Sequence, residues 1–140
     1  AKPQPEINKK TRAFSLAALS ILLIFVGVIM FTGDIEVTCG ETSFTIEASY
    51  WNDLTVEYDA IESIELREEN ISGIRTMGFA SVRLLLGYFE NEEFGRYTRY
   101  TYTNPEGCIV LTSGDQILVL SGRDAQETQN IYNYLTAKIN

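Results

Sequence analysis

The sequence predicts a mostly β domain that ends in one C-terminal α-helix and is preceded by one transmembrane helix. Three observations predict this fold class. Residues 13–33 contain no charged side chain, and apolar and polar residues alternate through most of the chain that follows. The last segment has helical periodicity and begins with a capping pattern.

The uncharged run has 21 residues, bounded by Arg12 and Asp34. At about 1.5 Å per residue a helix of this length spans roughly 31 Å, the thickness of a hydrocarbon core. A cleaved signal peptide has a shorter apolar region and a small-x-small cleavage site, which residues 29–33 do not provide. We therefore expect a basic N-terminal arm over residues 1–12, an uncleaved transmembrane helix over residues 13–33, and one domain over residues 34–140.

Charge is divided unequally along the chain. Residues 1–33 carry a net charge of +3 and residues 34–140 a net charge of −11. The positive-inside rule then predicts a cell-membrane protein whose arm is cytoplasmic and whose C-terminal domain is extracytoplasmic. The negative charge of that domain argues against a nucleic-acid partner, because affinity for phosphate backbones comes mainly from cations.

Alternating apolar residues predict seven or eight short strands in the domain. Gly40 and Gly114 lie in the two tightest turns expected between neighbouring strands. The longest gap, residues 68–81, contains two glycines and is expected to be an ordered loop. The expected strands cover residues 35–39, 43–48, 54–58, 63–67, 82–88, 97–103, 108–112 and 117–121.

The C-terminal segment predicts one amphipathic helix. Asp124 can cap its first turn, and Glu127 three residues later completes a capping-box pattern. One side of this helix should pack on the strands, at an open end of the β layer. The residues on that side are Thr128, Ile131, Tyr132, Leu135 and Ile139.

The order of these elements resembles the pleckstrin-homology-like (PH-like) arrangement, a barrel or roll of about seven strands closed by one terminal helix. The motifs that carry the resemblance are VEYDAIESIEL at residues 56–66, GIRTMGF at residues 73–79, Gly87-Tyr88-Phe89 with Gly95, and the helix over residues 124–135. They resemble a bacterial branch of the family that follows N-terminal transmembrane helices in Gram-positive membrane proteins. The resemblance covers about residues 35–135, implies the fold and carries no ligand over.

One departure from lipid-binding PH domains bears on partners. Those domains have basic residues in and beside the first hairpin, whereas residues 39–43 here read Cys-Gly-Glu-Thr-Ser. The departure disfavours phosphoinositide binding.

The candidate binding residues are Tyr97, Arg99, Tyr100 and Tyr102. Tyrosine and arginine dominate binding hot spots, so this segment could be a recognition strand. The alternative is an ordinary two-faced strand, with Tyr100 and Tyr102 packed inside and Arg99 paired to a neighbouring carboxylate.

The two cysteines leave two alternatives open. Cys39 and Cys108 could form a disulfide if the domain is extracytoplasmic, or they could be two buried free thiols.

Composition argues against catalysis. The chain has no histidine, and no Ser-x-x-Lys or Gly-x-Ser-x-Gly pattern supplies an activated nucleophile. The acidic stretches at residues 68–70 and 90–93 lack the spacing of a known cation loop and are expected to be solvated turns. We therefore expect no enzyme activity, no metal site and no cofactor.

The sequence favours a membrane-anchored, non-catalytic interaction module that binds a protein or peptide partner at the cell envelope or associates with itself. The alternative is a binder of a small ligand or an envelope component in the mouth of the barrel. A barrel mouth lined by apolar side chains with a few convergent polar groups would favour the small-ligand binder. A binding patch along a strand edge would favour the protein or peptide interaction module.

Overall fold

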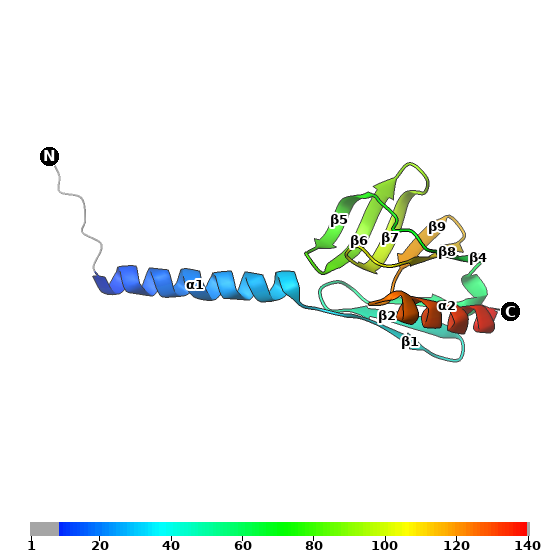
Figure 1. Ribbon diagram of the computed structural model, residues 1–140, viewed down its shortest axis with the longest axis horizontal. Coiled ribbons are helices and arrows are strands. Elements are labelled where there is room, and N and C mark those ends of the chain that lie inside the picture. The colour runs from blue at the N-terminus through cyan, green and yellow to red at the C-terminus, as the bar shows by residue number, and fades with distance from the viewer. Residues whose placement is uncertain (1–8, 140) are drawn as a thin grey trace. The chain divides into compact units, whose positions relative to one another are not determined.

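The computed structural model describes residues 9–139 in two compact units, of which the first ends at Thr32 and the second begins at Gly33. The first unit contains the helix α1, Lys9–Phe31, and the second contains all the strands and the helix α2, Ala125–Ile139 (Figure 1). The basic arm expected over residues 1–12 lies largely outside the described residues.

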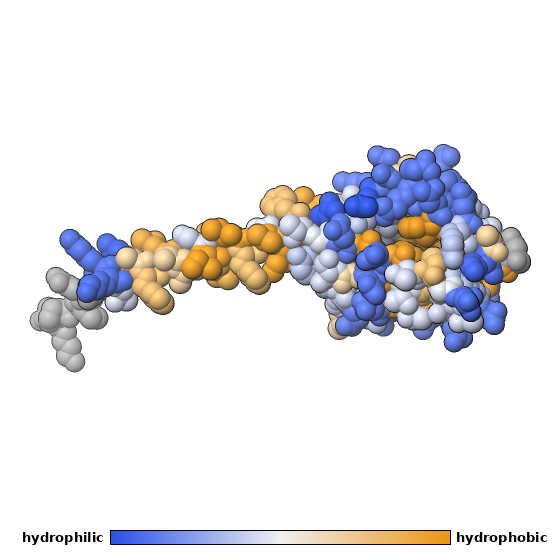
Figure 2. Space-filling model, turned by 90° about the horizontal axis from the view of Figure 1, so that it is seen from below, coloured by the Kyte–Doolittle hydropathy of each residue, from blue (hydrophilic) through white to orange (hydrophobic). Residues whose placement is uncertain are grey.

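The helix α1 is long and apolar enough to cross a membrane, and it is the one such helix among residues 9–139. Membrane anchors and signal sequences both have a helix of this kind near the N-terminus. Figure 2 shows its surface as mostly apolar. It begins four residues before the uncharged run and ends at Phe31, because Gly33 has a φ of 105° that no α-helix contains.

The strands form two sheets. The three-stranded sheet has the order β1-β2-β3, and the 3₁₀ turn η1, Tyr58–Ala60, leads from it to the six-stranded sheet, whose order is β4-β8-β9-β7-β6-β5. All neighbours are antiparallel except β7 and β9. The strand bounds are β1 Ile35–Cys39, β2 Ser43–Ala48, β3 Leu54–Glu57, β4 Ser63–Arg67, β5 Ile74–Ala80, β6 Leu84–Asn91, β7 Gly95–Tyr102, β8 Cys108–Ser113 and β9 Gln116–Leu120.

The expectation of a loop over residues 68–81 is wrong, because β5 lies within it. This strand pairs with β6 at the edge of the six-stranded sheet. Gly78 faces Gly87 across the pair, and a Cβ added at either position would collide with the backbone of the other strand. The two glycines that suggested a loop are therefore Gly73, before the strand, and Gly78, which allows close approach within it.

Two apolar clusters stabilise the domain. The larger lies between the sheets and includes Phe44 and Ile46 of β2, Leu86 of β6 and Leu120 of β9, all fully buried. The smaller lies on the other face of the six-stranded sheet, where Ile71, from the segment between β4 and β5, packs against it. The six-stranded sheet is therefore buried on both faces over its central strands.

The helix α2 packs beside η1, β4 and β8 (Figure 1). Its predicted cap is confirmed, since the Glu127 amide donates to Asp124 Oδ1 at 2.8 Å. The Glu127 carboxylate reaches the amide of Arg123 rather than that of Asp124. The predicted apolar side is also confirmed: Leu135 is fully buried in the larger cluster, and Ile131, Tyr132 and Ile139 pack against it.

The fold class predicted from the sequence is confirmed, with nine strands instead of seven or eight. Both predicted turns join antiparallel neighbours, β1 to β2 and β8 to β9. The second turn contains Gly114 with a φ of 61°, a conformation that favours glycine.

The docking of α2 can be tested by substitution. Leu135→Ala should lower the free energy of unfolding of residues 33–140 by about 2–5 kcal/mol, because it leaves a cavity in the larger cluster. Asn133→Ala, on the exposed side of the same helix, should change it by about 0.5 kcal/mol or less. Asp124→Ala should cost about 1 kcal/mol through loss of the cap. Urea melts measure all three, and equal small losses at residues 135 and 133 would contradict the docked helix.

Candidate interaction groove

The strand β7 divides the four predicted binding residues between its two faces. Tyr97 and Arg99 point to the smaller cluster, whereas Tyr100 and Tyr102 point to the larger one between the sheets. All four are buried, with exposed fractions between 1% and 6%. They therefore form no common surface, and their placement corresponds to the two-faced strand.

Arg99 is held by neutral acceptors instead of the carboxylate that the two-faced strand was expected to supply. Its Nε donates to Thr101 Oγ1 at 2.7 Å and its Nη2 to Asn70 Oδ1 at 2.8 Å, while its Nη1 donates to the carbonyl of Ile71. The guanidinium also lies 5.7 Å from the centre of the Phe89 ring. These contacts fix residues 70 and 71 over the sheet.

The hydroxyl groups of the three tyrosines differ in their partners. Tyr100 donates to the carbonyl of Asn52 at 2.7 Å, and burial raises the pKa of Tyr100 to about 12, so the hydroxyl stays protonated. Tyr102 contacts β1. The Tyr97 hydroxyl, beside Gly73, has no hydrogen-bond partner among the described residues.

Cys39 and Cys108 are free thiols. Cys39 packs against the larger cluster and Cys108 lies within the smaller one, so the six-stranded sheet separates them. Burial raises the pKa of both thiols. The sequence left open a disulfide or two buried free thiols; in the structure Cys108 is buried, whereas Cys39 is half-buried.

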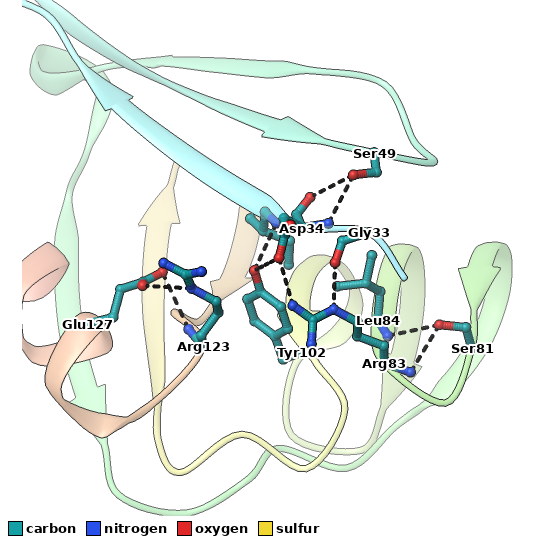
Figure 3. A network of polar contacts seen from close by, with 10 residues as sticks. Gly33, Asp34, Ser49, Ser81, Arg83, Leu84, Tyr102, Arg123 and Glu127 are labelled. Carbon is teal, nitrogen blue, oxygen red and sulfur yellow. Dashed lines mark hydrogen bonds and ion pairs between the residues drawn. The ribbon is translucent and has the colours of Figure 1, made fainter. Parts of the chain in front are cut away.

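A polar network holds the residues at which the second unit begins (Figure 3). Arg83 donates from Nε to the carbonyl of Gly33 at 2.6 Å and from Nη2 to Asp34 Oδ1 at 2.7 Å. The Tyr102 hydroxyl accepts the amide of Ile35 at 3.0 Å and donates to Asp34 Oδ1 at 3.3 Å. The chain is thus fixed to the six-stranded sheet at the first residues of β1.

Ser49 holds Asp34 from the neighbouring strand. The Asp34 amide donates to Ser49 Oγ at 2.9 Å, and the Ser49 amide donates to the Asp34 carbonyl at 3.2 Å. The hydrogen bonds from Arg83 lower the pKa of the Asp34 carboxyl. Because 64% of the Asp34 side chain is exposed, its ion pair with Arg83 adds little to stability. The main effect of the network is to fix the position of residues 33–35.

The strand β1 has one unpaired edge. Backbone hydrogen bonds join Asp34 to Ser49 and Gly40 to Ser43, so the even-numbered residues of β1 direct their backbone groups to β2. Residues 35, 37 and 39 therefore direct theirs away from β2. The amide of Ile35 follows this rule, since it donates to Tyr102 and not to β2.

A groove of about 410 Å³ lies beside this edge, between β1 and the start of α2. Apolar side chains form its floor: Ile35, Val37, Ile131 and the ring of Tyr102. Charged groups form its rim: Asp34, Glu36, Arg123 and Glu127, with Arg123 Nε 3.2 Å from a Glu127 oxygen.

A second hollow of about 640 Å³ lies where β5 begins and β6 ends, around residues 67–74 and 90–93. Polar and charged side chains form much of its lining, and Arg67 binds Glu93 at 2.6 Å. Within residues 9–139 there is no group of three or more side chains that could hold a metal ion.

Sequence reasoning missed the groove. Ile131 was identified as a packed residue of α2 and Val37 as part of a strand, but nothing in either pattern places them side by side. The one available signal was position in the hairpin: β1 precedes β2, and within residues 9–139 no strand comes before it to pair with its free side.

A family model described as "Bacterial PH domain" matches residues 35–135. No curated protein and no solved structure is significantly similar to the chain.

The tyrosine hydroxyls of β7 give a matched pair of substitutions. Tyr102→Phe should destabilise residues 33–140 by about 1–3 kcal/mol, because the buried amide of Ile35 loses its acceptor. Tyr97→Phe should change stability by about 0.5 kcal/mol or less, because its hydroxyl contributes no hydrogen bond. Urea unfolding of the two variants tests this ordering. A larger loss at residue 97 than at residue 102 would contradict the hydrogen bonding described above.

Proposed function

Because the chain belongs to the bacterial PH domain family, we propose that it is a membrane-anchored, non-catalytic binding module. Its partner is a protein or peptide, which binds in the groove between β1 and α2. The partner adds an extended segment to the free edge of β1.

The unpaired edge of β1 above an apolar floor is the observation that carries this proposal. Backbone groups of residues 37 and 39 face away from β2, so an added strand can exchange hydrogen bonds with them. Val37 and Ile131 are partly buried and offer apolar contacts to alternate side chains of that strand. Affinity would come from the backbone and selectivity from the floor.

The rim of the groove adds a preference of charge. Glu36 is exposed on β1, and 61% of the Arg123 side chain is exposed in spite of its pairing with Glu127. A partner that carries a basic group opposite Glu36 is favoured. Such rim charges act mainly on selectivity and on the rate of association.

The chemistry of the groove supports binding and not turnover. The chain has no histidine, and Asp34, Arg123 and Glu127 are each engaged in an ion pair. Ion pairing lowers the pKa of Asp34 and raises that of Arg123, so neither group can exchange protons near neutral pH.

The helix α1 supports the anchor. Its uncharged core is too long for the apolar region of a typical signal peptide, and four cations precede that core. We assign the chain to the membrane-anchored branch known from Gram-positive bacteria and the domain to the outer side of the cell membrane.

A small-ligand binder is the second candidate, and the 640 Å³ hollow is the observation in its favour. Sites for small molecules are lined mainly by apolar side chains. Glu69, Glu90, Glu92 and Glu93 line this hollow instead, so its ligand would have to be polar and cationic.

The groove proposal can be tested by crosslinking in intact cells. A photoreactive amino acid at residue 36, on the rim, should give a defined adduct with one partner. The same amino acid at residue 57, on the opposite edge strand β3, should give none. Adducts from residue 57 and not from residue 36 would contradict the proposed groove.

A proline substitution separates strand addition from other binding modes. Val37→Pro should abolish the adduct from residue 36 and leave the domain folded, because this amide points to the free edge and not to β2. Thr38→Pro is the control, since its amide faces β2 and its loss should destabilise the hairpin. An undiminished adduct in the Val37→Pro variant would rule out strand addition.

Orientation is tested by thiol labelling on a background that lacks Cys39 and Cys108. Glu92→Cys, in the exposed turn after β6, should react with a membrane-impermeant reagent in intact cells, because the acidic domain is proposed to be outside. Gln4→Cys, in the basic arm, should react only after lysis. The reverse pattern would place the domain in the cytoplasm.

A further inference from the structure

The turn between β5 and β6 presents an apolar side chain to solvent. Val82 is 57% exposed at its tip. The turn is well held: the Ser81 amide donates to the Leu84 carbonyl at 2.8 Å, and Ser81 Oγ accepts the amides of Arg83 and Leu84 at 3.1 and 2.9 Å. Val82 is therefore displayed on a rigid turn.

Arg83 ties this turn to the start of the second unit. Its guanidinium contacts the carbonyl of Gly33 and the carboxylate of Asp34. α1 ends at Phe31, and two residues of extended chain span at most about 7 Å. The turn is therefore fixed to the first residues of the second unit, which follow the last residue of α1 by two positions in the chain.

Aromatic side chains surround the same point. A Cβ added to Gly33 would lie 2.7 Å from the Tyr50 ring, and the Tyr50 and Phe79 rings are 5.1 Å apart. Tyrosine is enriched where hydrocarbon meets water, because its ring is apolar and its hydroxyl polar. A tyrosine and the turn that carries an exposed valine and an arginine thus lie beside Gly33, the residue at which the second unit begins.

We infer that the 81–83 turn and Tyr50 lie in the interfacial layer of the bilayer, with the Val82 side chain inserted among the lipids. This inference rests on the proposed membrane anchor and adds a second point of membrane contact. The occupant of this surface is lipid and not protein, because Arg83 binds Gly33, which follows the end of the proposed membrane helix by two residues. The contact is apolar, so it should persist in high salt.

Fluorescence quenching in lipid vesicles tests the inference on the full chain. Trp51 is the single tryptophan of the protein, so Trp51→Phe gives a background without tryptophan. Val82→Trp on this background should lose emission when the phosphatidylcholine of the vesicles is replaced by lipid brominated near the headgroup. In vesicles, the emission maximum of this variant should also lie at a shorter wavelength than that of the same variant unfolded in denaturant without detergent.

Glu92→Trp is the matched control. Residue 92 follows β6 at the end opposite to Leu84, and eight residues at about 3.3 Å place it more than roughly 20 Å away. Its emission should be the same in both kinds of vesicle. A comparison of the urea midpoints of the original chain and of the Trp51→Phe variant shows whether this substitution has altered the stability of the fold.

The outcomes separate this inference from the proposed function. Suppose that the Val82→Trp variant resists carbonate extraction and has equal emission in both kinds of vesicle. That result would overturn the lipid contact and leave the proposed membrane anchor unaffected. Extraction of the chain by carbonate would overturn the anchor and the lipid contact together. Quenching at residue 92 as strong as at residue 82 would overturn the placement of the turn.

Discussion

The apolar interior between the two sheets is the constraint on which the rest of the structure depends. Phe44 and Ile46 fill it from the three-stranded sheet, and Leu86 and Leu120 fill it from the six-stranded one. β2, which supplies two of these side chains, lies in the middle of its sheet, and β1 lies at an edge. The same interior receives Leu135, and so it brings α2 beside that edge and creates the groove.

Much of the fold followed from local patterns in the sequence. Strand alternation identified eight of the nine strands, and the Asp124–Glu127 pattern identified the start of α2, because each depends only on near neighbours in the chain. β5 escaped notice because Ile74 and Met77 are exposed and do not alternate with buried residues. Its place in the sheet depends on Gly78 meeting Gly87, a contact between strands that no single segment reveals.

The candidate site could not be predicted in the same way. The Tyr97–Tyr102 stretch looks like a recognition strand because its composition is that of a binding surface. Its burial depends on Ile71, which packs against one face, and on the three-stranded sheet, which covers the other. The groove residues carry no unusual composition at all, and only the tertiary position of β1 makes them a site.

The network around Asp34 has a mechanical consequence. Tension applied to the chain before Gly33 first meets the bonds of Gly33 and Asp34, which are made with Arg83 and with Ser49 beside β2. The load is therefore divided between the turn that leads into β6 and the β1–β2 hairpin. Part of any force that arrives through the preceding helix thus enters the six-stranded sheet directly, without passing along the edge strand.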